Sequence, residues 1–114
     1  DLREKMPMNI RASMPGKGMT TAVRADIERI TSMWRDCRKR FSGAAPRDDG
    51  FLFGAFSAAD AMYAPVVTRL RTYAVPMDTD TDAYCKAVLA YPPMKEWVEA
   101  ARNEPWLIEK YEPA

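Results

Sequence analysis

The chain has 114 residues, enough for one domain with a single hydrophobic core. Its 17 basic and 16 acidic residues nearly cancel, and no apolar run is long enough to cross a bilayer, so neither nucleic acid nor a membrane is an expected partner. There is no histidine, which removes the commonest general base near neutral pH and the commonest metal ligand.

The first expected element is the end of a helix at the N-terminus. Leu2, Met6 and Ile10 recur at four-residue spacing, as on one face of a helix. The Pro-Gly-Lys-Gly sequence at 15–18 should then turn the chain, because proline and glycine both interrupt helices. That sequence lacks the spacing of a phosphate-binding loop, so a turn is the preferred interpretation.

A long helix is predicted over residues 19–41. Its apolar residues follow a 4-3-4-3-4 rhythm on one stripe, formed by Val23, Ile27, Ile30, Trp34, Cys37 and Phe41. The basic residues 38–40 at its end suit the helix dipole, which explains them better than a nucleic-acid surface does. Cys37 and the distant Cys85 are expected to be reduced thiols packed in helices.

The next helix, expected from Ser57 to about residue 75, begins with the most specific local pattern in the chain. Ser57 is a good N-cap and Asp60 follows three positions later, so each side chain can bond the other residue's amide in a capping box. Such a cap stabilises a helix by about 1 kcal/mol. Pro65 should bend the helix, because it cannot donate to the carbonyl of Ala61.

The faces of this helix are also predicted. Met62, Val66, Val67 and Leu70 belong to a broad apolar arc, together with Ala59, Tyr63, Tyr73 and Ala74. The polar edge consists mainly of Thr68, Arg69, Arg71 and Thr72. A helix with so wide an apolar surface is expected near the centre of the fold.

Three further helices are predicted: one over 79–91, one after the two prolines at 92 and 93, and a short one after Pro105 in residues 106–111. The aspartates at 78, 80 and 82 imitate the start of a calcium loop. Ala83 and Leu89 occupy the positions that need glycine and glutamate, so no metal site is predicted. Thr79 and Asp82 form a possible second capping box instead.

These elements add up to five or six helices and no credible sheet. We therefore predict an all-α fold, an orthogonal helical bundle that occupies residues 1–114 as a single domain.

Two ordered motifs resemble a known family. The sequence FLFGAFSAADAMYAPVVTRLRTYAV, followed by YPPMKEWVEAARNEPW, is similar to the C-terminal helical domain of a bacterial cytosolic glutathione S-transferase. Ser57 and Asp60 match that family's buried capping box at the start of its central helix. Pro92 or Pro93 with Trp97 matches its later Pro-x-x-x-x-Trp pattern.

The resemblance implies a two-domain parent that conjugates glutathione, its co-substrate, to electrophilic small molecules in the cytoplasm. In this family glutathione binds an N-terminal thioredoxin-like domain, whose Tyr, Ser or Cys stabilises the thiolate. The 114 residues show no such domain, no catalytic residue and no cofactor site, so the chain alone should be inactive. We also expect homodimers or other self-association, because the face that would meet the partner domain should be exposed.

The resemblance also suggests where a substrate would bind. The first helix of this domain borders the electrophile pocket in glutathione transferases, which makes Met6, Met8 and Asn9 the candidate substrate-binding residues. Simple packing is an equally good explanation of these side chains. The alternative function is a non-catalytic protein–protein assembly module of the same fold, as occurs in translation factor and aminoacyl-tRNA synthetase complexes.

Overall fold

The computed structural model describes residues 1–43 and 47–113, and the predicted all-α class is confirmed. The described residues form five α-helices and one 3₁₀ turn: α1 (Leu2–Lys5), α2 (Thr21–Phe41), α3 (Ala58–Thr72), α4 (Thr79–Ala90), α5 (Pro92–Arg102) and η1 (Glu109–Tyr111). Within this part of the chain the only β pairing is two isolated bridges between residues 51 and 55.

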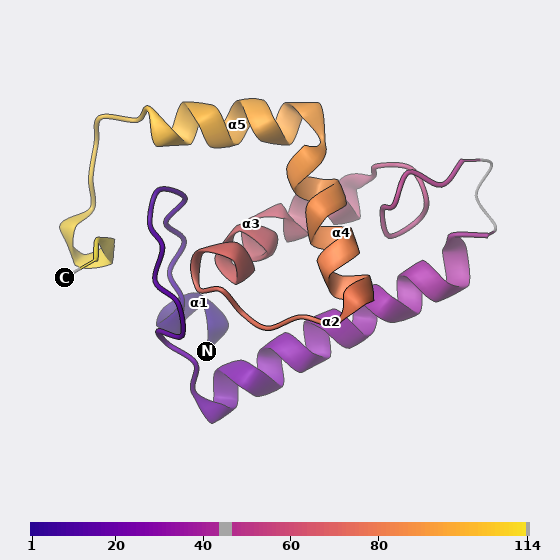
Figure 1. The fold of residues 1–114 in the computed structure, drawn as a ribbon, viewed down its shortest axis with the longest axis horizontal. Coiled ribbons are helices and arrows are strands. Elements are labelled where there is room, and N and C mark those ends of the chain that lie inside the picture. The colour runs from indigo at the N-terminus through magenta and orange to yellow at the C-terminus, as the bar shows by residue number, and fades with distance from the viewer. Residues whose placement is uncertain (44–46, 114) are drawn as a thin grey trace.

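The helices pack around α4, which contacts α2, α3 and α5. Figure 1 shows α2 along the lower edge, α5 along the upper edge, and α4 crossing between them at steep angles. The C-terminal segment then turns down beside the loop that follows α1, so both ends of the chain lie on the same side of the molecule (Figure 1). This return of the C-terminus creates the pocket described below.

The stripe predicted on α2 faces the core. Val23, Ile27 and Trp34 are buried, while Ile30 and Cys37 pack against the core from its edge. Thr20 caps the helix, since its hydroxyl accepts a hydrogen bond from the Val23 amide at 3.1 Å. Trp34 meets Tyr63 of α3 and Tyr84 of α4, with ring centroids 5.4 and 4.8 Å apart. This tryptophan therefore joins three helices in one aromatic cluster.

The faces predicted for α3 need correction. Met62 lies at the edge of the apolar arc and is 79% exposed, because the arc is wider than the face that the other helices cover. Thr68 and Thr72 are buried rather than on a solvated edge. Each hydroxyl has a main-chain acceptor, the Pro65 carbonyl at 2.7 Å and the Asn9 carbonyl at 3.0 Å, so burial leaves neither unsatisfied.

The ends and caps of several predicted helices also differ. α2 begins at residue 21 instead of 19, and α3 ends at residue 72 instead of near 75. α1 ends at Lys5, because Pro7 has no amide proton and excludes helical geometry at Met6 before it, so Ile10 lies outside the helix. α4 is capped by Asp78 rather than Thr79, with its carboxylate 2.7 Å from the Thr81 amide. The last predicted helix is reduced to η1, since residues 106–108 are not helical.

The predicted turn at residues 15–18 lies against the end of α1. Gly18 has φ of 75°, a left-handed conformation that side chains disfavour. A Cβ atom on this glycine would collide with the Lys5 carbonyl oxygen. Glycine is therefore required where the turn passes closest to α1.

Candidate functional site

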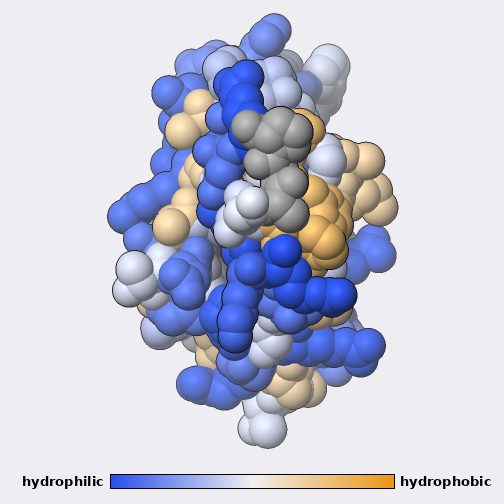
Figure 2. All heavy atoms as spheres, turned by 90° about the vertical axis from the view of Figure 1, so that its right-hand side faces the viewer, coloured by the Kyte–Doolittle hydropathy of each residue, from blue (hydrophilic) through white to orange (hydrophobic). Residues whose placement is uncertain are grey.

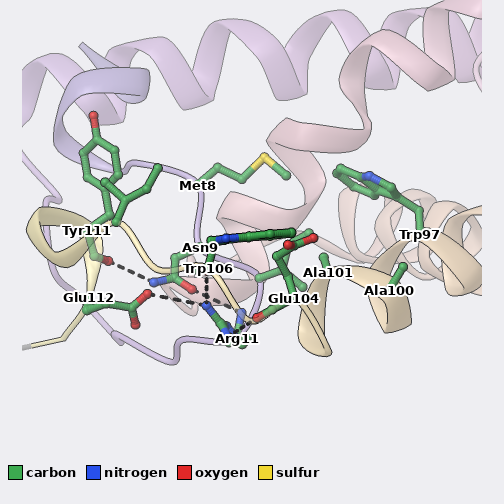
Figure 3. A pocket seen from close by; sticks show the side chains of 12 residues that line it. Met8, Asn9, Arg11, Trp97, Ala100, Ala101, Glu104, Trp106, Tyr111 and Glu112 are labelled. Carbon is green, nitrogen blue, oxygen red and sulfur yellow. Dashed lines mark hydrogen bonds and ion pairs between the residues drawn. The ribbon is translucent and has the colours of Figure 1, made fainter.

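A pocket of about 370 Å³ lies between residues 8–11, the second half of α5 and the C-terminal segment 104–112 (Figure 3). None of the three parts could form it alone, because each supplies a different wall. Its apolar lining comes from Met8, Ile10, Trp97, Ala100, Ala101, Trp106 and Ile108. Its polar lining comes from Asn9, Arg11, Glu104, Tyr111 and Glu112.

The first wall of the pocket consists of residues 8–11, and the end of α3 and Tyr73, which directly follows it, hold the chain just before this wall in place. The Tyr73 hydroxyl donates to the Pro7 carbonyl at 2.8 Å, and Arg69 Nε donates to the Met6 carbonyl at 3.0 Å. Burial raises the pKa of Tyr73, so its hydroxyl keeps the proton that this bond requires. These bonds fix the main chain of the wall and leave the Met8 side chain free to face the pocket.

Asn9 joins the first wall to the C-terminal segment. Its Nδ2 donates to the Tyr111 carbonyl at 2.9 Å, while its Oδ1 accepts from the Arg11 and Ala12 amides at 3.2 Å each. Every bond of the carboxamide thus goes to the protein's own main chain. Asn9 shapes the pocket wall, and one N–H of its carboxamide has no partner among the described residues and remains available.

Arg11 is the second link to the C-terminal segment. Its Nη1 donates to the Glu104 carbonyl at 2.8 Å and its Nη2 to the Trp106 carbonyl at 3.2 Å. The Glu112 carboxylate lies 3.9 Å from the same Nη2. The dashed lines in Figure 3 show these bonds converging on one guanidinium group. These bonds tie the non-helical residues 104–106 to the wall formed by residues 8–11.

Aromatic side chains dominate the open side of the pocket. Figure 3 shows Trp97 of α5, Trp106 and Tyr111 spread across it, with Met8 facing the same space. Trp97 is 42% exposed and Trp106 is 78% exposed. Solvent and a ligand can therefore reach both indole rings.

The structure separates the three predicted substrate-binding residues. Met8 and Asn9 line the pocket, but Met6 is completely buried in the core and does not reach it. The Met6 assignment needs correction on that ground, because α1 ends just before it and turns its side chain inward. Sequence reasoning missed Arg11 and the C-terminal segment. The only available signal was the unusually apolar run at 106–108.

The predicted capping pair occupies a different place, at the start of α3. Ser57 is the N-cap and Asp60 the third helical residue, in capping-box geometry. The Ser57 amide donates to Asp60 Oδ2 at 2.9 Å, and the Ser57 hydroxyl donates to the same oxygen at 3.2 Å. The Asp60 amide bonds the Ser57 carbonyl at 3.1 Å, so the carboxylate half of the box is the stronger half.

Asp60 does more than cap α3. It is fully buried, and its Oδ1 accepts from the Leu52 amide at 3.1 Å and from the Tyr84 hydroxyl at 2.8 Å. Burial, followed by the bond to Asp60, raises the pKa of Tyr84, which keeps that hydroxyl a donor. One carboxylate thus ties the loop before α3 to α3 itself and to α4.

Among the described residues, the thiol of Cys85 is packed in the core and is not arranged for catalysis. Cys85 is buried 3.7 Å from the Met77 sulfur, and burial raises the pKa of its thiol to about 12. No group of three or more acidic or cysteine side chains in residues 1–43 and 47–113 is arranged to hold a metal ion. Within the same part of the chain, no helix combines the length and apolar character needed to span a membrane.

Comparison with known proteins adds one match. The family model described as "Glutathione S-transferase, C-terminal domain" matches residues 20–100, more than half of the chain. No curated protein and no solved structure matches the chain significantly. The matched range includes α2 to α4, most of α5 and the Ser57–Asp60 pair, but neither the first wall of the pocket nor its C-terminal wall.

Proposed function

The chain belongs to the glutathione S-transferase C-terminal domain family, and we propose that it forms the acceptor side of a glutathione transferase. In this proposal the pocket beside Met8 binds an electrophilic small molecule. A thioredoxin-like domain supplied by another part of the protein would present the glutathione thiolate. The sulfur would then attack the electrophilic carbon of the acceptor.

The observation that supports this role most is the composition of the pocket. Its lining combines a thioether, two indole rings and small α5 residues, which suits an apolar ring held by contact and stacking. None of its lining residues is a cysteine, serine or lysine that could act as a nucleophile. In this proposal the pocket positions the acceptor, and the thioredoxin-like domain activates the thiol.

A binding experiment tests the role directly. 1,3-Dinitrobenzene resembles an electrophilic acceptor but lacks a leaving group, so it can bind without reacting. We expect it to quench the emission of Trp97 and Trp106, which line the pocket, more than that of the buried Trp34. Trp106→Ala should weaken binding about 3- to 10-fold through loss of one stacking surface.

The matched control for this variant is Met62→Ala, which also truncates a strongly exposed apolar side chain but lies outside the pocket. It should leave the affinity unchanged. With glutathione and 1-chloro-2,4-dinitrobenzene, the chain alone should give only the uncatalysed rate. Equal dissociation constants for wild type and Trp106→Ala would count against the proposed pocket. Turnover proportional to protein concentration would contradict the proposal that another domain activates the thiol.

We also propose that the chain associates with itself. Met33 of α2, Phe53 of the loop before α3 and Met62 of α3 are exposed by 41%, 43% and 79%. Separately, Figure 2 shows apolar side chains gathered beside strongly hydrophilic ones at one end of the molecule. Exposed apolar surface of this kind favours association.

Sedimentation velocity should show a weight-average mass that rises with concentration. Met62→Glu should reduce that rise, because a charge on the interface is costly to bury. Ala25→Glu adds the same charge at an exposed site of α2 and serves as the control. A wild-type chain that stays monomeric at several hundred micromolar would disprove the association.

A further inference from the structure

We propose that the pocket selects flat aromatic ligands that carry a positive charge. This inference rests on the proposed function, because it names the ligand class of the same pocket. It follows from two features considered together, the free faces of the aromatic rings and the charges that line the walls.

The first feature is a set of unstacked rings. Trp97, Trp106 and Tyr111 all line the pocket, and in the part of the chain that the structure describes none of them pairs with another aromatic ring. Their π faces attract cations, most strongly those of the indoles. One face already does so, since Lys110 Nζ lies 4.9 Å from the centre of the Tyr111 ring.

The second feature is an excess of negative charge. Glu104 and Glu112 line the pocket, whereas Arg11 is the only cationic side chain among the lining residues. One positive and two negative groups give the lining residues a formal charge of −1. Lys110, which lies over the Tyr111 ring, is not a lining residue and stands outside this count, so Trp97 and Trp106 are the rings left for a further cation. The Arg11 charge faces Glu112 at 3.9 Å, while Glu104 forms no ion pair within residues 1–43 and 47–113.

The positive charge of Arg11 already has partners within the protein. Its Nη1 and Nη2 donate to the Glu104 and Trp106 carbonyls, and the Glu112 carboxylate lies 3.9 Å from Nη2. An anionic ligand at Arg11 would share the guanidinium group with these acceptors, whereas a cationic ligand would meet the indole faces and the Glu104 carboxylate.

Three bicyclic probes of similar shape test the charge preference by isothermal titration calorimetry at pH 8 and low salt. They are 1-methylquinolinium, which is cationic, quinoline, which is neutral, and 1-naphthoate, which is anionic. We expect the cation to bind about 5- to 20-fold more tightly than quinoline, and 1-naphthoate to bind most weakly. The advantage of the cation should shrink in 0.5 M salt because the pocket is open to solvent.

Glu104→Gln should lower the ratio of cation to quinoline affinity about 2- to 5-fold and leave quinoline itself within about 2-fold of wild type. The side chain is exposed, so the variant should fold normally. Glu96→Gln removes the same charge from the exposed surface of α5 outside the pocket, and the ratio should then stay close to that of wild type.

The outcomes separate the two proposals. Quinoline binding with no preference for the cation, or tightest binding of 1-naphthoate, would overturn the charge inference and leave the acceptor pocket standing; in the second case Arg11 would set the preference. Failure of all three probes to bind would overturn the inference and the proposed function together.

Discussion

Replacing Asp60 by alanine should lower the free energy of unfolding by about 3–5 kcal/mol. The carboxylate is fully buried and accepts bonds from the Leu52 amide, the Ser57 amide and hydroxyl, and the Tyr84 hydroxyl. Removing it leaves several buried donors without an acceptor, and each such donor costs about 1–3 kcal/mol. Urea unfolding followed by far-UV circular dichroism measures the change.

Two further variants show whether the loss comes from the network or from the helix cap alone. Tyr84→Phe removes a single donor and should cost about 1–2 kcal/mol. Asp80→Ala removes an exposed carboxylate from the first turn of α4 and should cost less than about 0.5 kcal/mol. If Asp60→Ala cost no more than the roughly 1 kcal/mol of an ordinary cap, the buried network would have no special role.

Trp34→Ala should destabilise the fold by about 3–5 kcal/mol, comparable to the loss of Asp60. The side chain is 1% exposed and contacts both Tyr63 and Tyr84, so its removal leaves a cavity where α2, α3 and α4 meet. The same urea titration measures the effect, because circular dichroism does not depend on the lost fluorophore.

Trp34→Phe is the informative companion variant. Trp34 Nε1 is buried and has no hydrogen-bond partner among the described residues, so phenylalanine removes an unsatisfied donor as well as some volume. The two effects oppose each other, and the net cost should be only about 1–2 kcal/mol. A loss as large as that of Trp34→Ala would show that the indole nitrogen is satisfied, for example by a buried water molecule.

The two predictions are coupled through Tyr84. Its ring packs on Trp34 and its hydroxyl bonds Asp60, so the aromatic cluster and the polar network share one residue. Effects of substitutions at positions that share a partner are not additive. The double variant Trp34→Phe with Tyr84→Phe should therefore differ from the sum of the single variants, whereas Trp34→Phe with Asp80→Ala should not.

Much of the fold could be predicted from sequence because its signals are local. The periodicity of residues 23–41 identified both α2 and its buried stripe, and Ser57 with Asp60 marked the start of α3. The two prolines at 92 and 93 marked the start of α5. Each signal lies within a few turns of one helix, where spacing and capping chemistry act directly.

The errors arose where hydrogen bonds or chain turns placed a side chain differently from its helical pattern. Thr68 and Thr72 looked like a solvated edge, but acceptors inside and outside α3 allow them to be buried. Residues 106–108 looked helical, but in the structure residues 104–108 are not helical and are joined to Arg11 through the Glu104 and Trp106 carbonyls. Met6 was predicted to contact a ligand, but its side chain, just after the end of α1, is buried in the core.

The sequence by itself determined the helices, their main buried stripes and the family, because these depend on spacing and on short motifs. Only the tertiary structure decided where the pocket lies. The pocket exists because Asn9 and Arg11 hold the main-chain carbonyls of residues about a hundred positions away. Every residue carries a main-chain carbonyl, so the sequence does not indicate which carbonyl will accept a hydrogen bond from a distant side chain.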